Sequence, residues 1–165
     1  MMRTSFFILC LGMFLIFGMT GSAFALQSGG VEMGDLETGS VVGQPFKELD
    51  VDMAFTAMKV GNKQGWYPPT AVLNLVAQGT GGRAGRPVLL QVTNNLGSDY
   101  TFHLSADSAF AGPTSMTAKL TLKPGETKYI GIPTSDLTYV TANNVLNYTN
   151  PSAKDDLSGQ LLILR

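Results

Sequence analysis

The chain has 165 residues, a formal net charge of −1 and charged side chains at only 14% of its positions. A nucleic-acid-binding protein would carry a basic face or stripe, so this near-neutral balance argues against that class of partner. The sequence contains only one cysteine, Cys10, so a disulfide within one chain is excluded. It also contains only one histidine, His103.

The first 25 residues are typical of a signal peptide that directs export and is then removed. Arg3 supplies the positive start, residues 6–17 form an apolar run, and Ala23 and Ala25 form the small-residue processing site. We expect cleavage after Ala25, which removes Cys10 and leaves a periplasmic or secreted chain with no membrane span. The alternative is an uncleaved anchor, since residues 6–25 are about long enough to cross a bilayer.

Residues 26–47 are rich in glycine and serine. Such a composition buries little apolar surface, so it predicts a flexible N-terminal arm ahead of a folded domain at residues 48–165. The alternative is an arm that becomes ordered against a partner. The apolar residues available for that contact are Val31, Met33, Leu36, Val41, Val42 and Phe46.

Beyond residue 48, short runs of β-branched, aromatic and leucine residues alternate with turn sequences, which is typical of an all-β sandwich or barrel. We predict strands at residues 51–60, 70–77, 87–93, 100–105, 117–122, 128–132, 138–141, 146–149 and 160–164, and no long helix. Turns are expected at residues 79–85, 94–97, 123–126 and 150–152, which contain glycine, proline, asparagine or serine.

Side-chain alternation assigns a buried face to two of these strands. In the strand 87–93, one face carries Val88, Leu90 and Val92, and the other carries Leu89, Gln91 and Thr93. In the strand 100–105, one face carries Tyr100, Phe102 and Leu104, and the other carries Thr101, His103 and Ser105. The aromatic face is the better core candidate, so we expect His103 on the polar side, where it can titrate near neutral pH.

Four segments occur in an order and spacing that resembles the cupredoxin family, the Greek-key sandwiches that include plastocyanin and related exported copper proteins. They are Trp66-Tyr67-Pro68-Pro69, residues 87–95, residues 122–127, and Tyr148 with residues 159–164. The resemblance extends from about residue 66 to residue 164. It implies a cupredoxin-like, all-β Greek-key sandwich.

The resemblance places the family's copper ligands on residues with the wrong chemistry. The first histidine position falls on Tyr100, the cysteine position on Asn150, the second histidine position near Ala153 and the axial methionine position near Leu157. A blue-copper centre depends on a cysteine thiolate and two imidazoles. We therefore expect no blue-copper site and no cofactor.

Enzyme chemistry has little support in the sequence. Ser105 follows His103 closely, but no nucleophile-elbow turn accompanies them. Asp155 and Asp156 lie in a turn, where solvation explains the paired carboxylates. The glycine-rich residues 79–86 lack the Gly-Lys-Ser/Thr ending of a phosphate-binding loop. We therefore expect a protein without catalytic activity.

The predicted function is that of a non-catalytic accessory or binding subunit, which contacts another envelope or secreted protein. The predicted contact residues are Trp66, Tyr67, Arg83 and Arg86, because aromatic and arginine side chains are common interface anchors. Trp66 has a second interpretation, as a plug that closes one end of the sandwich.

The alternative function is copper binding or electron transfer at an atypical, non-blue site. Its candidate ligands are His103, Tyr100 and a nearby carboxylate such as Asp99 or Asp107. Copper(II) accepts nitrogen and oxygen ligands of this kind.

Overall fold

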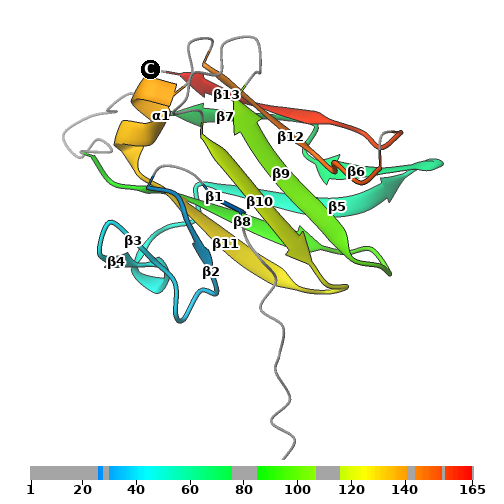
Figure 1. Ribbon diagram of the computed structural model, residues 1–165, viewed down its shortest axis with the longest axis horizontal. Helices are drawn as coiled ribbons and strands as arrows, with labels where there is room; N and C mark the ends of the chain where they lie inside the picture. Colours follow the sequence, from blue (N-terminus) through cyan, green and yellow to red (C-terminus); the bar gives the residue numbers. More distant parts are fainter. Residues whose placement is uncertain are drawn as a thin grey trace, which may run out of the picture.

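The computed structural model describes residues 26–27, 30–75, 85–106, 116–140, 144–153 and 155–164. These residues form two facing β-sheets with one short α-helix (Figure 1). The predicted signal peptide, including Cys10, and the predicted contact residue Arg83 lie outside the described residues. Within the described ranges, every helix is too short or too polar to cross a lipid bilayer.

The larger sheet has six strands in the order β1-β10-β9-β12-β13-β7. These strands are β1 Leu26–Gln27, β7 Thr70–Asn74, β9 Tyr100–Ala106, β10 Thr117–Leu122, β12 Val145–Thr149 and β13 Gly159–Leu164. The second sheet has five strands in the order β2-β11-β8-β5-β6. These are β2 Glu32–Gly34, β5 Met53–Val60, β6 Lys63–Tyr67, β8 Val88–Asn94 and β11 Thr127–Ile132.

Three shorter elements complete the described structure. Strands β3 (Ser40–Val41) and β4 (Gln44–Pro45) form a separate two-stranded sheet. A 3-10 helix, η1 (Phe46–Glu48), follows β4 directly, and the helix α1 (Thr134–Val140) follows β11.

Strands β8 to β11 form a Greek key. β8 belongs to the five-stranded sheet, β9 and β10 are antiparallel neighbours in the six-stranded sheet, and β11 returns to pair with β8. Two strand pairs are parallel, β5 with β8 and β7 with β13. The all-β Greek-key sandwich that the sequence predicts is therefore confirmed.

The main core lies between the two sheets, and the predicted faces of β8 and β9 are confirmed. The inward side chains of these two strands are Val88, Leu90, Val92, Tyr100, Phe102 and Leu104, all buried in one cluster. The rings of Phe55, Phe102 and Tyr148 pack at centroid distances of 4.8 to 5.8 Å. Full burial of such a side chain contributes about 1.5–3 kcal/mol to folding.

The segment predicted as a flexible arm is folded onto the five-stranded sheet from residue 30 onward. β2 pairs with β11, and Val31, Val41 and Phe46 are fully buried. A Cβ added to Gly39 or Gly131 would come within 2.3 or 2.6 Å of the Phe46 ring. The glycines in and around this segment therefore allow close packing of an aromatic ring, and the sandwich begins well before residue 48.

Residues 138–141 were predicted as a strand, and this is wrong for residues 138–140, while residue 141 lies outside the described residues. The helix α1 covers residues 134–140 and buries Leu137. Pro133 immediately precedes it, and Asp136 places a negative charge in its first turn. The ring of any proline fixes φ near the helical value. These signals for a helix start outweigh the β-branched residues that follow.

The segment before Pro68 forms a regular strand, although proline itself cannot donate a ladder hydrogen bond. Strand β6 pairs antiparallel with β5 through Tyr67, and the prolines begin only after the strand has ended. Gly61, with a φ of +63°, lies in the turn that connects the two strands. Proline therefore ends the strand and does not prevent it.

Candidate functional site

The positions that the resemblance assigns to the first histidine and to the cysteine of a copper site meet at one end of the sandwich. Tyr100 begins β9, and Asn150 directly follows β12, the neighbour of β9. The Oη atom of Tyr100 donates a hydrogen bond to Oδ2 of Asp156 at 2.5 Å. The Nδ2 atom of Asn150 donates to the same oxygen at 3.4 Å. We call these three residues the Tyr100 cluster.

The loop between β12 and β13, which carries Asp156, is held against β6. The backbone N–H of Leu157 donates to the carbonyl of Gln64 at 2.8 Å, and Leu157 forms a parallel bridge with Gly65. A Cβ added to Gly65 would lie 2.6 Å from the Cβ of Leu157. This contact requires glycine at position 65, and it fixes the loop beside the Tyr100 cluster.

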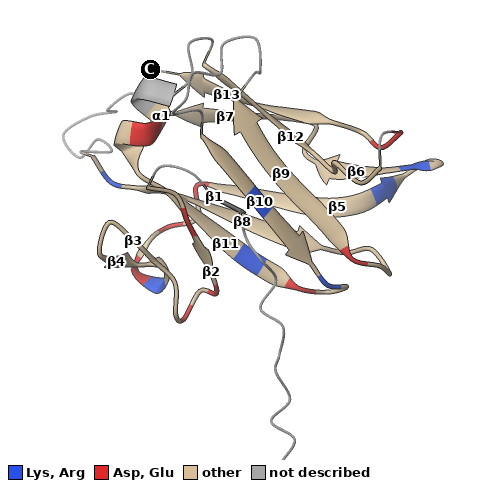
Figure 2. Cartoon of the chain, viewed as in Figure 1, with Lys and Arg blue, Asp and Glu red and all other residues tan. Residues whose placement is uncertain are grey.

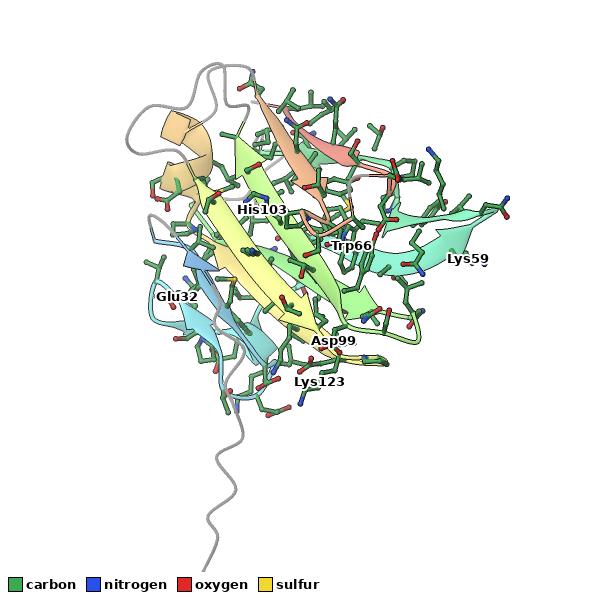
Figure 3. The ribbon with its side chains drawn as sticks, turned by 45° about the vertical axis from the view of Figure 1, so that its right-hand side comes forward. Glu32, Lys59, Trp66, Asp99, His103 and Lys123 are labelled. Atoms are coloured by element: carbon green, nitrogen blue, oxygen red, sulfur yellow. The ribbon has the colours of Figure 1, made fainter. Side chains whose placement is uncertain are left out.

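Trp66 closes this end of the sandwich (Figure 3). Its Nε1 atom donates to the carbonyl of Thr101 at 3.2 Å, and its ring packs on Tyr100 and Phe102 at centroid distances of 5.3 and 4.9 Å. The side chain is only 2% exposed. Trp66 is therefore a core residue, and its predicted role as a partner contact is corrected, because its ring cannot reach another protein.

The electrostatics of the Tyr100 cluster favour a neutral phenol. Burial raises the pKa of Tyr100 far above its ordinary value, and the hydrogen bond to Asp156 and the negative charge of that carboxylate raise it further. Tyr100 therefore remains a hydrogen-bond donor throughout the physiological pH range. Its proton stays directed at the carboxylate of Asp156.

The donors of the Tyr100 cluster do not fit a blue-copper centre. They are a protonated phenol, a carboxamide and a carboxylate, whereas blue copper depends on a thiolate and two imidazoles. Ala153 and Leu157, at or near the two remaining ligand positions, have side chains without any donor atom. Across the residues with described positions, no group of three His, Cys, Asp or Glu side chains is arranged to hold a metal ion.

His103 lies on the other face of β9, on the outer surface of the six-stranded sheet (Figure 3). It is half-buried and lies in register with Lys119 of β10 and Thr149 of β12. Burial lowers the pKa of His103, and the positive charge of Lys119 lowers it further. Because Tyr100 points into the core, the structure does not bring these two candidate copper ligands together.

The remaining predicted contact residues lie far apart. Tyr67 is 55% exposed, and the pairing of β6, β5 and β8 places it level with Thr93. Arg86 precedes β8 and forms an exposed ion pair with Asp50 at 3.1 Å. Thr93 lies seven positions after Arg86 along mostly extended chain, which is about 23 Å. Tyr67 and Arg86 therefore cannot belong to one small contact site.

Comparisons with known proteins identify similar structures but no similar sequences. No protein-family model matches the chain, and no curated protein matches it. One similar structure is a point mutant of amicyanin in its reduced Cu(I) form at pH 4, with a TM-score of 0.42 and 11% identity over 70% of this chain and 84% of that chain. Another is auracyanin B, with a TM-score of 0.45 and 12% identity over 71% of this chain and 92% of that chain.

Asp156 is the member of the Tyr100 cluster that the sequence did not reveal. Its pairing with Asp155 in a turn indicated a solvated carboxylate, and Asp155 is indeed exposed. Asp156 instead accepts hydrogen bonds from two side chains that lie 56 and 6 residues away. The available signal was its place in the loop between the predicted cysteine and methionine positions.

Proposed function

We propose that this chain is an exported, non-catalytic binding or accessory subunit, built on a cupredoxin-like sandwich without the blue-copper ligands. The observation that carries the proposal is the Tyr100 cluster. At the positions where the resemblance places copper ligands, the phenol of Tyr100 and the amide of Asn150 both donate to one carboxylate oxygen of Asp156. Their hydrogen bonds hold the ends of β9 and β12 together without a metal ion.

The absence of catalysis is supported by the position of His103, the only histidine in the sequence. It lies on an open sheet face, where its register neighbours are Lys119 and Thr149. Nucleophilic catalysis requires a base hydrogen-bonded to a serine, threonine or cysteine. In the described part of the chain, His103 has no such hydrogen bond.

Binding through protein contacts is supported by the surface beside the Tyr100 cluster. Tyr67 shares a strand face with Gly65, and Leu157 lies over Gly65. Tyr67 and Leu157 are 55% and 36% exposed, so both offer apolar surface beside β6. Tyrosine is a frequent interface anchor, and the buried Trp66 supports this end rigidly.

A copper titration tests the first half of the proposal. Tag-free, processed protein is titrated with Cu(II) by calorimetry, and bound metal is measured after gel filtration. We expect no stoichiometric copper and no intense blue colour, and a His103→Ala variant should behave identically. Stoichiometric binding that is lost in His103→Ala would instead support the alternative, an atypical copper protein.

Affinity capture from the native envelope tests the second half. We expect the wild-type protein to retain a partner in a reproducible stoichiometry, and Tyr67→Ser to lose it. Val60→Ser is the matched control, because Val60 is 52% exposed and lies at the far end of β5. Identical capture by both variants would contradict a contact at Tyr67.

A further inference from the structure

Strand β7 lies at the edge of the six-stranded sheet, where β13 is its neighbour (Figure 1). The N–H of Gln160 donates to the carbonyl of Pro69 at 3.0 Å, and the N–H of Leu75 donates to the carbonyl of Leu164 at 2.8 Å. Backbone groups of successive strand residues point to opposite sides. Thr70 and Val72 therefore direct their N–H and C=O groups away from β13, toward a side where no described strand pairs.

This edge lacks the features that usually prevent strands from pairing. Edge strands are commonly blocked by lysine, proline or a bulge. β7 contains neither residue and pairs with β13 without a bulge, and β12 and β13 are also uncharged (Figure 2). The opposite case is β6, which contains Lys63 and is partly covered by Leu157.

An apolar row on the outer face of the sheet ends at this edge. Val72, Leu162 and Val145 are aligned in register across β7, β13 and β12. Val72 is 48% exposed, and Leu164, further along β13, is 50% exposed. The neighbouring row contains Thr70, Gln160 and Asn147, which are polar but uncharged. The edge and its adjoining face therefore offer both backbone hydrogen bonds and apolar contact area.

We propose that two copies of this chain pair through this edge, with β7 antiparallel to β7 of the second copy about a two-fold axis at Val72. The edge is self-complementary, because the outward N–H of Val72 in each copy donates to the outward C=O of Val72 in the other. The two apolar rows then join into one continuous row. No like charges meet, since every strand near the axis is neutral.

The expected affinity follows from the small size of the contact. A pair of five-residue strands buries less than about 1,200 Å², the low end of specific interfaces, so we expect a dissociation constant on the order of micromolar. The dimer does not depend on the proposed partner contact at Tyr67, which lies on the other sheet.

Sedimentation velocity of the tag-free protein, from about 1 to about 100 µM, tests the dimer. We expect a concentration-dependent monomer–dimer equilibrium. Val72→Lys should shift it to at least about tenfold higher concentration, because two like charges would face each other at the axis. Val60→Lys is the matched control, since this equally exposed valine lies outside the edge, and it should leave the equilibrium unchanged.

Amide hydrogen exchange provides a second measurement that needs no variant. We expect protection of the Val72 N–H to rise with protein concentration, because that group becomes hydrogen-bonded in the dimer. A protein that stays monomeric across the whole range would overturn the proposal. A dimer that Val72→Lys and Val60→Lys affect equally, with Val72 exchange independent of concentration, would overturn it as well.

Discussion

Asn94 is a buried polar side chain that holds the loop between β8 and β9. Its Nδ2 atom donates to the carbonyls of Ser98 at 2.8 Å and Leu122 at 3.0 Å, and its Oδ1 atom accepts from the N–H of Leu96 at 2.9 Å. Both polar atoms of the side chain are therefore paired, which offsets the cost of burying them. The loop leads directly into Tyr100 and the Tyr100 cluster.

Replacing Asn94 with alanine should destabilise the protein more than the same replacement at its exposed neighbour, Asn95. Asn94→Ala leaves three backbone groups without these partners, so we expect the free energy of unfolding to fall by about 2–4 kcal/mol. Asn95→Ala, at an exposed position, should change it by less than about 0.5 kcal/mol. Urea unfolding of both variants measures the difference, and equal effects would show that the side chain of Asn94 does not hold the loop.

Val42 has a backbone conformation that is unfavourable for its side chain. Val42 and Gly43 have φ values of +50° and +75°, and they connect β3 and β4 as the two central residues of a tight turn. Such turns favour Asn-Gly, and a left-handed conformation costs an ordinary residue about 1–2 kcal/mol. The valine is also 69% exposed, so it recovers little of that cost by packing.

We therefore expect Val42→Asn to stabilise the protein by about 1 kcal/mol, because asparagine tolerates this conformation. Val51→Asn is the control, since Val51 is 41% exposed and has no positive φ. It should give no comparable gain. The midpoints of chemical unfolding compare the two variants, and a loss of stability in Val42→Asn would contradict strain at this turn.

At the scale of elements, the packing of the segment 30–49 on β11 requires a residue without a side chain at Gly131. A Cβ at Gly131 would lie 2.6 Å from Cε1 of Phe46 and 2.7 Å from Cβ of Val41. Both side chains belong to the small buried cluster that also contains Leu89. The lack of a side chain at position 131 therefore lets this cluster pack closely on the outer face of the five-stranded sheet.

Gly131→Ala should therefore loosen the segment 30–49. We expect a loss of about 1–3 kcal/mol from overpacking, together with faster proteolysis within that segment. Gly97→Ala is the control, because a Cβ at Gly97 meets nothing within 4 Å. Limited proteolysis followed by mass spectrometry locates the first cleavage. Cleavage that is equally slow in both variants would show that Phe46 adjusts without detaching.

The core strands were predictable because alternation and turn residues agree there. The strand at residues 117–122 has the predicted bounds, and those near residues 100 and 146 differ by one residue. The helix α1 was missed because Thr138 and Val140 resemble strand residues, while its start signals occupy only the preceding turn. The fold of the segment 30–49 was missed because a glycine-rich composition is typical of disorder. In the structure, the same glycines allow close packing.

The site was predictable only in part. The resemblance located Tyr100 and Asn150, and the structure brings both to Asp156. The contact with Asp156 depends on how the loop after β12 closes, which no local pattern encodes. The burial of Trp66 likewise depends on its Tyr100 and Phe102 neighbours from another sheet, so the aromatic sequence alone left both a surface anchor and a plug possible.

At the scale of the whole molecule, stability should depend on pH through His103. Burial and the nearby Lys119 lower the pKa of His103 below the usual 6.5, so the folded protein binds this proton less readily than the unfolded chain. The unfolded chain therefore takes up the proton first as pH falls below about 6.5. The contribution of uncharged His103 to the free energy of unfolding is complete above that pH. It is lost as the pH falls toward the folded-state pKa.

We expect the melting temperature of the wild type to fall more than that of His103→Gln as pH decreases from about 7.5 to about 5.5. Lys119→Gln should weaken this pH dependence without removing it, because burial, the larger cause, remains. All three proteins share the same carboxylates, so the difference between wild type and variant isolates the histidine. Differential scanning calorimetry provides the measurement. Parallel pH profiles for wild type and His103→Gln would mean that the half-buried imidazole accepts its proton as readily in the folded state as in the unfolded one.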